Sequence, residues 1–202
     1  MTFILAQGGP HVFGTAKKDG MDGFCVCVQP TADAVCVAAH DRDFGGIAAL
    51  RKTRFSDLPK LKDGGAFPRL SDALDIGAAI INVELVGEPG WKNALAAVEA
   101  HDSIHRVIFS SLEHSEILQL WAACPKAKCG FIWEAHEADA IEEEELSDLP
   151  NALLLFVPAV SIRARPGFWS KHAKRLVVYG LARREDAASL GFEPAGCIVE
   201  RQ

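Results

Sequence analysis

The sequence predicts an α/β protein, a compact (β/α)₈ TIM barrel with an antiparallel hairpin extension after the second strand. Short apolar runs alternate with helical patterns along most of the 202-residue chain, which is typical of a parallel sheet covered by helices. The strand candidates are apolar on both faces, as buried parallel strands require. The length is near the lower limit for one barrel. No linker or internal repeat divides it, so we expect a single domain over residues 1–202.

Strands and helices are expected in alternation. The strand candidates are Phe3–Ala6, Gly23–Val28, Val35–Ala39, Ile80–Val86, Val107–Ser111, Gly130–Glu134, Ala152–Val157, Leu176–Leu181 and Gly196–Glu200. The helix candidates are Leu70–Gly77, Trp91–Ala100, Ser115–Ala123, Ala138–Leu146, Gly167–Ala173 and Arg184–Leu190. The long segment Asp41–Arg69 is expected to be an irregular excursion before the next helix.

A hairpin explains why there is one strand candidate too many for an eight-stranded barrel. The link Gln29–Ala34 is about six residues long, whereas a parallel crossover needs a dozen or more. We therefore expect Val35–Ala39 to fold back antiparallel on Gly23–Val28. The remaining strands can then close a barrel.

Composition and charge exclude several functional classes. The formal net charge is −6 and the pI is about 5.6, which argues against binding nucleic acid through a general basic field. No run of 18 apolar residues is present, so no membrane span is expected. The N-terminus lacks the features of a signal peptide. The six cysteines fit reduced thiols in a chain too long to need disulfides, and we therefore expect a cytoplasmic protein.

The strand–turn–strand segment near the N-terminus carries a cluster of reactive residue types. Cys25 and Cys27 are two positions apart, so the period of a strand puts both side chains on one face. With the turn centred near Ala32, His40 is expected roughly opposite Phe24 and Cys25. The segment could therefore bring two thiols and an imidazole together.

Several short motifs follow one another in a fixed order along the chain. They are Ala6–Gly9, Gly20–Val28, Thr31–Asp33, Val37–Asp41, Phe67–Leu74, Ile81–Val86, Val107–Ser111, Arg184–Ala187 and Gly196–Glu200. Each motif is weak alone, but their collinear order is moderately specific. This order resembles that of the glycerophosphodiester phosphodiesterase family over nearly the whole chain. The resemblance implies a (β/α)₈ barrel that hydrolyses phosphodiesters in lipid metabolism.

The resemblance also implies a site made of two imidazoles and a divalent metal, calcium or magnesium, held by three carboxylates. Two positions match this pattern in the present sequence: His40 as the second, catalytic imidazole and Glu84 as the third carboxylate, a metal ligand. The others differ. Gln7 stands at the position of the first His, Gly8 at that of an Arg, and Val86 at that of a Lys. The first two carboxylates are replaced by Cys25 and Cys27.

These replacements predict a protein in which the standard site is degraded and hydrolysis is weak or absent. A general acid or base contributes about 10²–10⁴-fold to a rate, and Gln exchanges no proton near neutral pH. Gln7 can still hydrogen-bond a small phosphodiester or related ligand. Glu134, at a predicted strand end where barrel enzymes place their sites, is a second candidate ligand-binding residue.

The alternative is an active phosphodiesterase, a phosphoric diester hydrolase, with a rebuilt site. Its metal would be zinc, because thiolate, imidazole and carboxylate are all zinc ligands. Cys25, Cys27, His40 and Glu84 would then converge at the barrel mouth. The other interpretation of the two cysteines is simple packing in a vacated pocket, because Cys is among the most often buried residue types.

Overall fold

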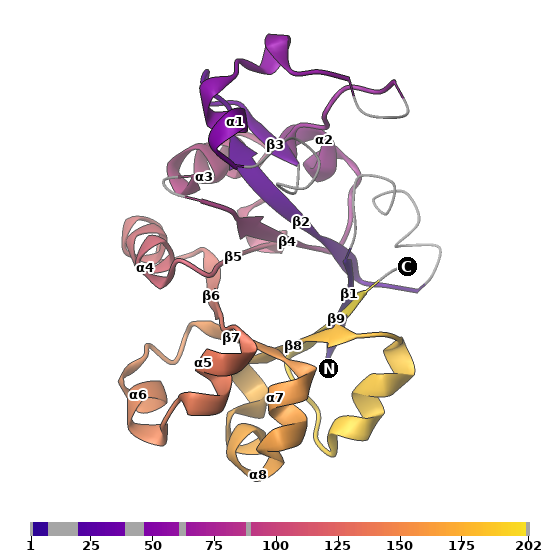
Figure 1. Cartoon of the computed structure of the whole chain (residues 1–202), viewed down its shortest axis with the longest axis vertical. Coiled ribbons are helices and arrows are strands. Elements are labelled where there is room, and N and C mark those ends of the chain that lie inside the picture. The colour runs from indigo at the N-terminus through magenta and orange to yellow at the C-terminus, as the bar shows by residue number, and fades with distance from the viewer. Residues whose placement is uncertain (1, 8–19, 39–46, 61–63, 88–89, 201–202) are drawn as a thin grey trace.

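The computed structural model describes residues 2–7, 20–38, 47–60, 64–87 and 90–200. Parallel strands close a barrel surrounded by helices (Figure 1), which confirms the predicted (β/α)₈ TIM barrel. The sheet runs in the order β1-β9-β8-β7-β6-β5-β4-β2-β3, and a further pairing of β1 with β2 closes it. The strands are β1 Phe3–Gln7, β2 Gly23–Pro30, β3 Cys36–Ala38, β4 Ile80–Leu85, β5 Val107–Ser111, β6 Lys128–Ile132, β7 Leu154–Pro158, β8 Leu176–Leu181 and β9 Gly196–Glu200.

The barrel is closed by its first strand, which lies between the last and the second. In β1, Leu5 is the register partner of Ile198 in β9 and of Gly23 in β2, both in parallel pairings. On its other side, Gly23 permits the close approach of β2 to β4, because a Cβ atom there would lie 1.6 Å from the carbonyl oxygen of Ile80. No other residue type fits without displacing β4.

β3 is antiparallel to β2 and lies beyond the closed ring. Val28 faces Ala38 and Pro30 faces Cys36, so the turn is centred at Asp33 and not near Ala32, and the expected register was wrong by one to two residues. The Thr31 backbone N–H donates to the Val35 carbonyl oxygen at 2.9 Å within this turn. His40 lies outside the described residues.

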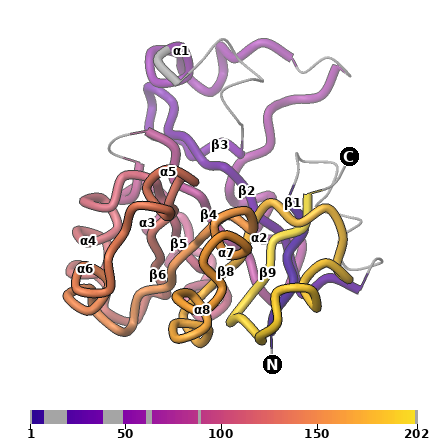
Figure 2. The backbone as a smooth tube through the Cα atoms, turned by 60° about the horizontal axis from the view of Figure 1, so that its bottom comes forward, coloured from indigo at the N-terminus to yellow at the C-terminus, as the bar shows by residue number. Residues whose placement is uncertain are grey.

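Helices form the outer layer (Figure 2). The α-helices are α1 Ile47–Lys52, α2 Leu70–Asp75, α3 Trp91–Ala100, α4 His114–Ala123, α5 Ala135–Ala140, α6 Glu143–Asp148, α7 Ala159–Ala164 and α8 Pro166–Trp169. The 3₁₀ helices are η3 Phe55–Asp57, η4 Ile104–Arg106, η5 Ser170–Arg175 and η6 Arg184–Leu190. Within the described ranges, no helix is long and apolar enough to cross a membrane.

Some expected elements differ from the observed ones. The single helix expected over Ala138–Leu146 is two helices, α5 and α6, because Ile141 and Glu142 both have extended backbone angles. The segment expected to be irregular contains α1 and η3, and α7 was not predicted. The last two expected helices, Gly167–Ala173 and Arg184–Leu190, are largely 3₁₀ helices.

The core has an inner and an outer part. Two clusters lie between the barrel and the helices, one beneath α2–α4 and one beneath α5–α8. A third fills the barrel and consists of Leu5, Cys25, Ile108, Phe156, Val177 and Ile198. The large Phe156 side chain fits because Gly130 lies beside it in β6, where a Cβ atom would be 2.6 Å from the Phe156 ring.

Candidate functional site

The candidate site is the end of the barrel at which the parallel strands terminate. Leu5, Cys25 and Ile108 pack inside the barrel. Because side chains alternate along a strand, residues two positions further on the same strands also face inward, nearer the mouth. Gln7, Cys27 and Ser110 occupy these positions, and Glu84 shares the face because it is the register partner of Cys27.

The two cysteines occupy different levels of the barrel. Cys25 is buried and is the register partner of Gln7 on one side and of Asn82 on the other. Cys27 is half-buried and lies beside Glu84. The sequence therefore identified their common face but not their difference in depth.

Burial keeps the Cys25 side chain a neutral thiol. Desolvation is the main reason why the pKa of Cys25 is raised far above its ordinary value, and the negative charge of Glu84 raises this pKa further. A hydrogen bond with the Asn82 side chain lowers the pKa by a smaller amount. Because nucleophilic attack requires the thiolate, the buried, neutral Cys25 is poorly suited to act as a nucleophile.

Asn82 and Ser110 form a buried polar pair below Glu84 that sequence reasoning did not connect. The Asn82 Nδ2 atom donates to Ser110 Oγ at 3.0 Å, and both residues are fully buried. Within the described ranges, Asn82 Oδ1 has no hydrogen-bond partner. Because side chains alternate along β4, the sequence could have placed Asn82 on the same face as Glu84, which follows it by two positions.

Tyr179 is a second residue of the mouth that sequence reasoning missed. It is half-buried at the end of β8, and its hydroxyl donates to the Trp133 carbonyl oxygen at 2.7 Å. Burial, with smaller contributions from the negative charges of Glu134 and Glu84, raises the pKa of Tyr179 to about 12. Tyr179 is therefore a neutral phenol at physiological pH, beside an acidic part of the mouth.

Glu134 has a structural role at the start of α5. Its backbone N–H donates to Glu137 Oε2 at 3.0 Å in a capping box, and its carboxylate lies 3.6 Å from Nδ1 of His136. The Glu134 side chain is 58% exposed. These contacts account for the position of the Glu134 side chain without a ligand. Its negative charge also raises the pKa of Tyr179.

A buried carboxylate supports the loop that follows β4. Glu116 of α4 is 3% exposed, and its Oε1 atom accepts the backbone N–H of Trp91 at 2.9 Å, at the first residue of α3. A negative charge at a helix N-terminus is stabilising. Glu116 therefore holds the start of α3 close to the strand that carries Glu84.

Calcium and magnesium take oxygen ligands, and the described part of the mouth carries sulfur at two of the three ligand positions that the sequence resemblance implies. Neutral Cys25 and half-buried Cys27 stand at two positions where the sequence resemblance implies carboxylates. In the part of the chain that the structure describes, no group of three or more His, Cys, Asp or Glu side chains could hold a metal ion. A zinc set that includes His40 stays a prediction, because His40 lies outside that part.

Comparison with known proteins gives a clear answer for the fold only. No protein-family model matches the chain, and no curated protein sequence matches it. Several solved structures, in contrast, match the chain. A glycerophosphodiester phosphodiesterase from Parabacteroides distasonis matches with a TM-score of 0.77 and 16% identity, over 98% of this chain and 92% of that one.

Two further structures agree. A glycerophosphodiester phosphodiesterase from Agrobacterium tumefaciens has a TM-score of 0.72 and 19% identity, over 99% of this chain and 96% of that one. A phosphodiesterase from Oleispira antarctica, solved with its product sn-glycerol-3-phosphate, has a TM-score of 0.74 and 16% identity, over 99% of this chain and 92% of that one. The chain therefore has the fold of the glycerophosphodiester phosphodiesterases.

Proposed function

We propose that this chain binds a small phosphodiester, or a related phosphate ester, at the barrel mouth and hydrolyses it weakly or not at all by the family's metal-dependent mechanism. The fold supports the ligand class, since a phosphodiesterase of the same fold binds sn-glycerol-3-phosphate. The altered residues of the mouth support the loss of efficient hydrolysis. We also propose a role in the cytoplasm, in lipid metabolism.

The observation that carries this proposal is the alignment of Cys27 with Glu84 on neighbouring strands, with Cys25 one level deeper. Of the ligand positions that the resemblance implies, those in the described part of the chain would offer a hard cation one carboxylate and two sulfur atoms. Burial and the charge of Glu84 both oppose ionisation of Cys25. The chain's own residues thus disfavour the cation that would otherwise offset the charge of a phosphodiester.

The remaining polar groups suit binding better than proton transfer. The half-buried Gln7 is the last residue of β1 and lies beside Cys25 of β2 and beside Glu200, the last residue of β9. Its amide can donate and accept hydrogen bonds but does not titrate near neutral pH. Tyr179 likewise stays protonated there. Such groups can orient a ligand without acting as a general acid or base.

A second candidate is an active phosphodiesterase with a rebuilt zinc site. The same register favours it, because Cys27 and Glu84 are adjacent on one face. Zinc accepts thiolate, imidazole and carboxylate ligands, and Cys₂His sites with an open position are catalytic in other proteins. His40 would complete such a set.

The decisive experiment combines binding and turnover on the full chain. Calorimetry should detect saturable binding of sn-glycerol-3-phosphate, weakened in the Gln7→Ala variant. The matched control Glu99→Gln, at the surface on α3, should bind normally. Turnover of glycerophosphodiesters should stay near background with calcium, magnesium, manganese or zinc.

Two results would overturn the proposal. Metal-dependent turnover that His40→Ala or Glu84→Ala abolishes would establish the active alternative, and stoichiometric zinc in chelator-free protein would identify its metal. Absence of binding by both sn-glycerol-3-phosphate and intact glycerophosphodiesters would exclude the ligand class.

A further inference from the structure

A second pocket lies at the opposite end of the barrel from the mouth. Its volume is about 420 Å³, which is within the range of small-molecule sites. The end of α6 and the loop after it form one wall, and η5 forms the other. These segments immediately precede β7 and β8. The pocket is therefore at the end of the barrel where the strands begin.

The lining of this pocket is basic in a chain whose net charge is −6. The polar lining residues that carry the argument are Ser147, Asn151, Lys171, His172, Lys174 and Arg175. Among the described residues that line it, none is Asp or Glu. Two lysines, one arginine and one histidine thus line the same cavity as hydroxyl and amide groups.

Arg175 holds the two walls together. Its Nε donates to the Leu153 carbonyl oxygen at 3.0 Å, and its Nη2 donates to the Pro150 carbonyl oxygen at 3.1 Å. Its Nη1 donates to Asn151 Oδ1 at 3.3 Å. All these acceptors are uncharged, so the positive charge of Arg175 is not neutralised by them.

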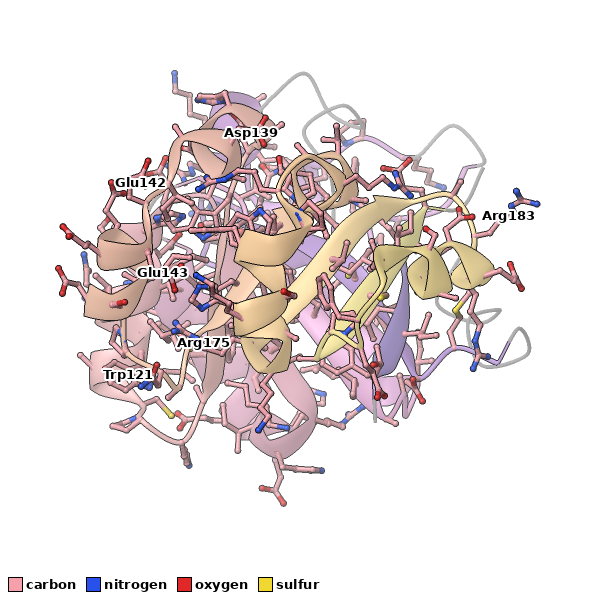
Figure 3. All side chains as sticks on the ribbon, turned by 90° about the horizontal axis from the view of Figure 1, so that it is seen from below. Trp121, Asp139, Glu142, Glu143, Arg175 and Arg183 are labelled. Carbon is pink, nitrogen blue, oxygen red and sulfur yellow. The ribbon has the colours of Figure 1, made fainter. Side chains whose placement is uncertain are left out.

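Among the described residues, Glu143 is an anion that contacts two residues of this pocket. Glu143, at the start of α6, lies 3.0 Å from Lys171 Nζ and 3.3 Å from His172 Nε2. Figure 3 shows Glu143 and Arg175 on the same side of the molecule. The hydrogen bond from Lys171 lowers the pKa of Glu143. The two residues of η5 thus already bind a carboxylate.

His172 is not fully satisfied by this contact. Its Nε2 is buried and, within the described ranges, makes no hydrogen bond of good geometry, although Glu143 Oε1 is near. Lys174 is exposed on the same 3₁₀ helix. A ligand in the pocket can therefore meet one lysine directly, and a second lysine and an imidazole if Glu143 moves aside.

We propose that this pocket binds a small phosphate-bearing anion, with Lys174 as a direct contact and with Lys171 and His172 as contacts in competition with Glu143. Phosphate oxygens accept charge-assisted hydrogen bonds from Lys. Burial lowers the pKa of His172, so its imidazole would contribute an uncharged N–H donor. Arg175 adds its charge while it fixes the walls. The site is independent of the ligand proposed for the mouth.

The test is calorimetric titration of the full chain with pyrophosphate and with inorganic phosphate, at constant ionic strength. We expect saturable binding of at least one of them. Lys174→Gln should weaken it about tenfold, as the loss of one charge-assisted contact implies. Glu143→Gln should strengthen it several-fold, since it removes the competing carboxylate without shortening the side chain.

Lys126→Gln is the matched control, because Lys126 is an exposed lysine that also lies near a carboxylate, 3.7 Å from Glu99, but is outside the pocket. Binding by this variant should equal that of the unmodified chain. The proposal would be overturned by no saturable binding of either anion, by equal weakening in Lys126→Gln and Lys174→Gln, or by no gain in Glu143→Gln. It would also be overturned if Gln7→Ala abolished the binding, which would assign the anion to the mouth.

Discussion

Cys27 and Glu84 are register partners on the neighbouring parallel strands β2 and β4, and both face the inside of the barrel near its mouth. Cys25 lies one level deeper, beside Asn82. The carboxylate of Glu84 and the two sulfur atoms therefore belong to one polar column, in which burial increases from the mouth inward. The chemistry of this column can be tested one residue at a time.

The two cysteines of the column should differ in their reactivity. Of the six cysteines, Cys27 is half-buried, whereas the other five are buried. Brief treatment of the native chain with a maleimide should therefore label Cys27 first, and Cys27→Ser should remove this fast reaction. Cys25→Ser should leave it unchanged. Mass spectrometry of peptides gives the site directly, and early labelling of Cys25 would contradict the burial on which its neutral state depends.

The ionisation of Tyr179 should report the charge of the mouth. Tyr179 is the one tyrosine of the sequence, so the absorbance of tyrosinate follows this residue alone. After a rapid alkaline jump it should titrate near 12, above the ordinary value of 10.0. Glu134→Gln and Glu84→Gln should lower this pKa, because each removes a negative charge that disfavours the phenolate, while Glu99→Gln should not.

Because folding raises the pKa of Tyr179, the free energy of unfolding should depend on pH. When folding raises the pKa of a group, the contribution of that group to stability is fully present below its pKa in the unfolded chain. The contribution is lost as the pH rises through its pKa in the folded chain. Tyr179 should therefore favour the folded state up to about pH 10 and lose this contribution towards pH 12. Tyr179→Phe should make unfolding by base less steep in this window.

Loss of the Glu116 carboxylate should destabilise the fold. Glu116→Ala removes the acceptor of the Trp91 N–H and leaves a cavity at a position that is 3% exposed. We expect a loss of about 2–3 kcal/mol in the free energy of unfolding, measured with urea. Gln119→Ala, on the exposed face of the same helix, should cost less than about 0.5 kcal/mol. Equal effects of the two substitutions would show that the capping contact contributes little.

The close approach of β2 and β4 should make Gly23 irreplaceable. In Gly23→Ala the new methyl group would lie 1.6 Å from a backbone oxygen of Ile80, so the strands must separate. We expect a loss of at least about 3 kcal/mol, at the upper end of overpacking effects. Gly167→Ala is the control, because nothing lies within 4 Å of its Cβ position. It should be neutral or slightly stabilising, and comparable stability of the two variants would refute the geometry.

The strands could be predicted from the sequence because buried parallel strands are continuous apolar runs. Leu176–Leu181 and Gly196–Glu200 have the predicted bounds. The helices were harder where a helix directly follows a strand. α7 begins one residue after β7 ends, and its residues Ala159–Ala164 continue the same apolar composition. Pro158 marks the end of the strand, but no capping Ser, Thr, Asp or Asn marks the start of the helix.

The candidate site was predictable in its positions but not in its contacts. Period-two alternation placed Cys25 and Cys27 on one face, and the order of the motifs pointed to Glu84. The proximity of Tyr179 to Glu84 and Glu134 depends on how the barrel closes, which brings together strands far apart in the sequence. The contact of Glu116 with Trp91 depends in the same way on the packing of α3 against α4.

The position of β1 between β2 and β9 also has a consequence for how the chain reaches its native state. Leu5 and Ile198 are register partners although almost the whole chain separates them. Until β9 has been made and has docked, both β1 and β8 present an unpaired edge to solvent. Such edges pair readily with other chains, and contacts of this sequence separation form slowly. A nascent or truncated chain without β9 should therefore aggregate, whereas a circular permutant that links β9 to β1 should close its barrel only with a linker of about a dozen residues or more, because the two strands are parallel.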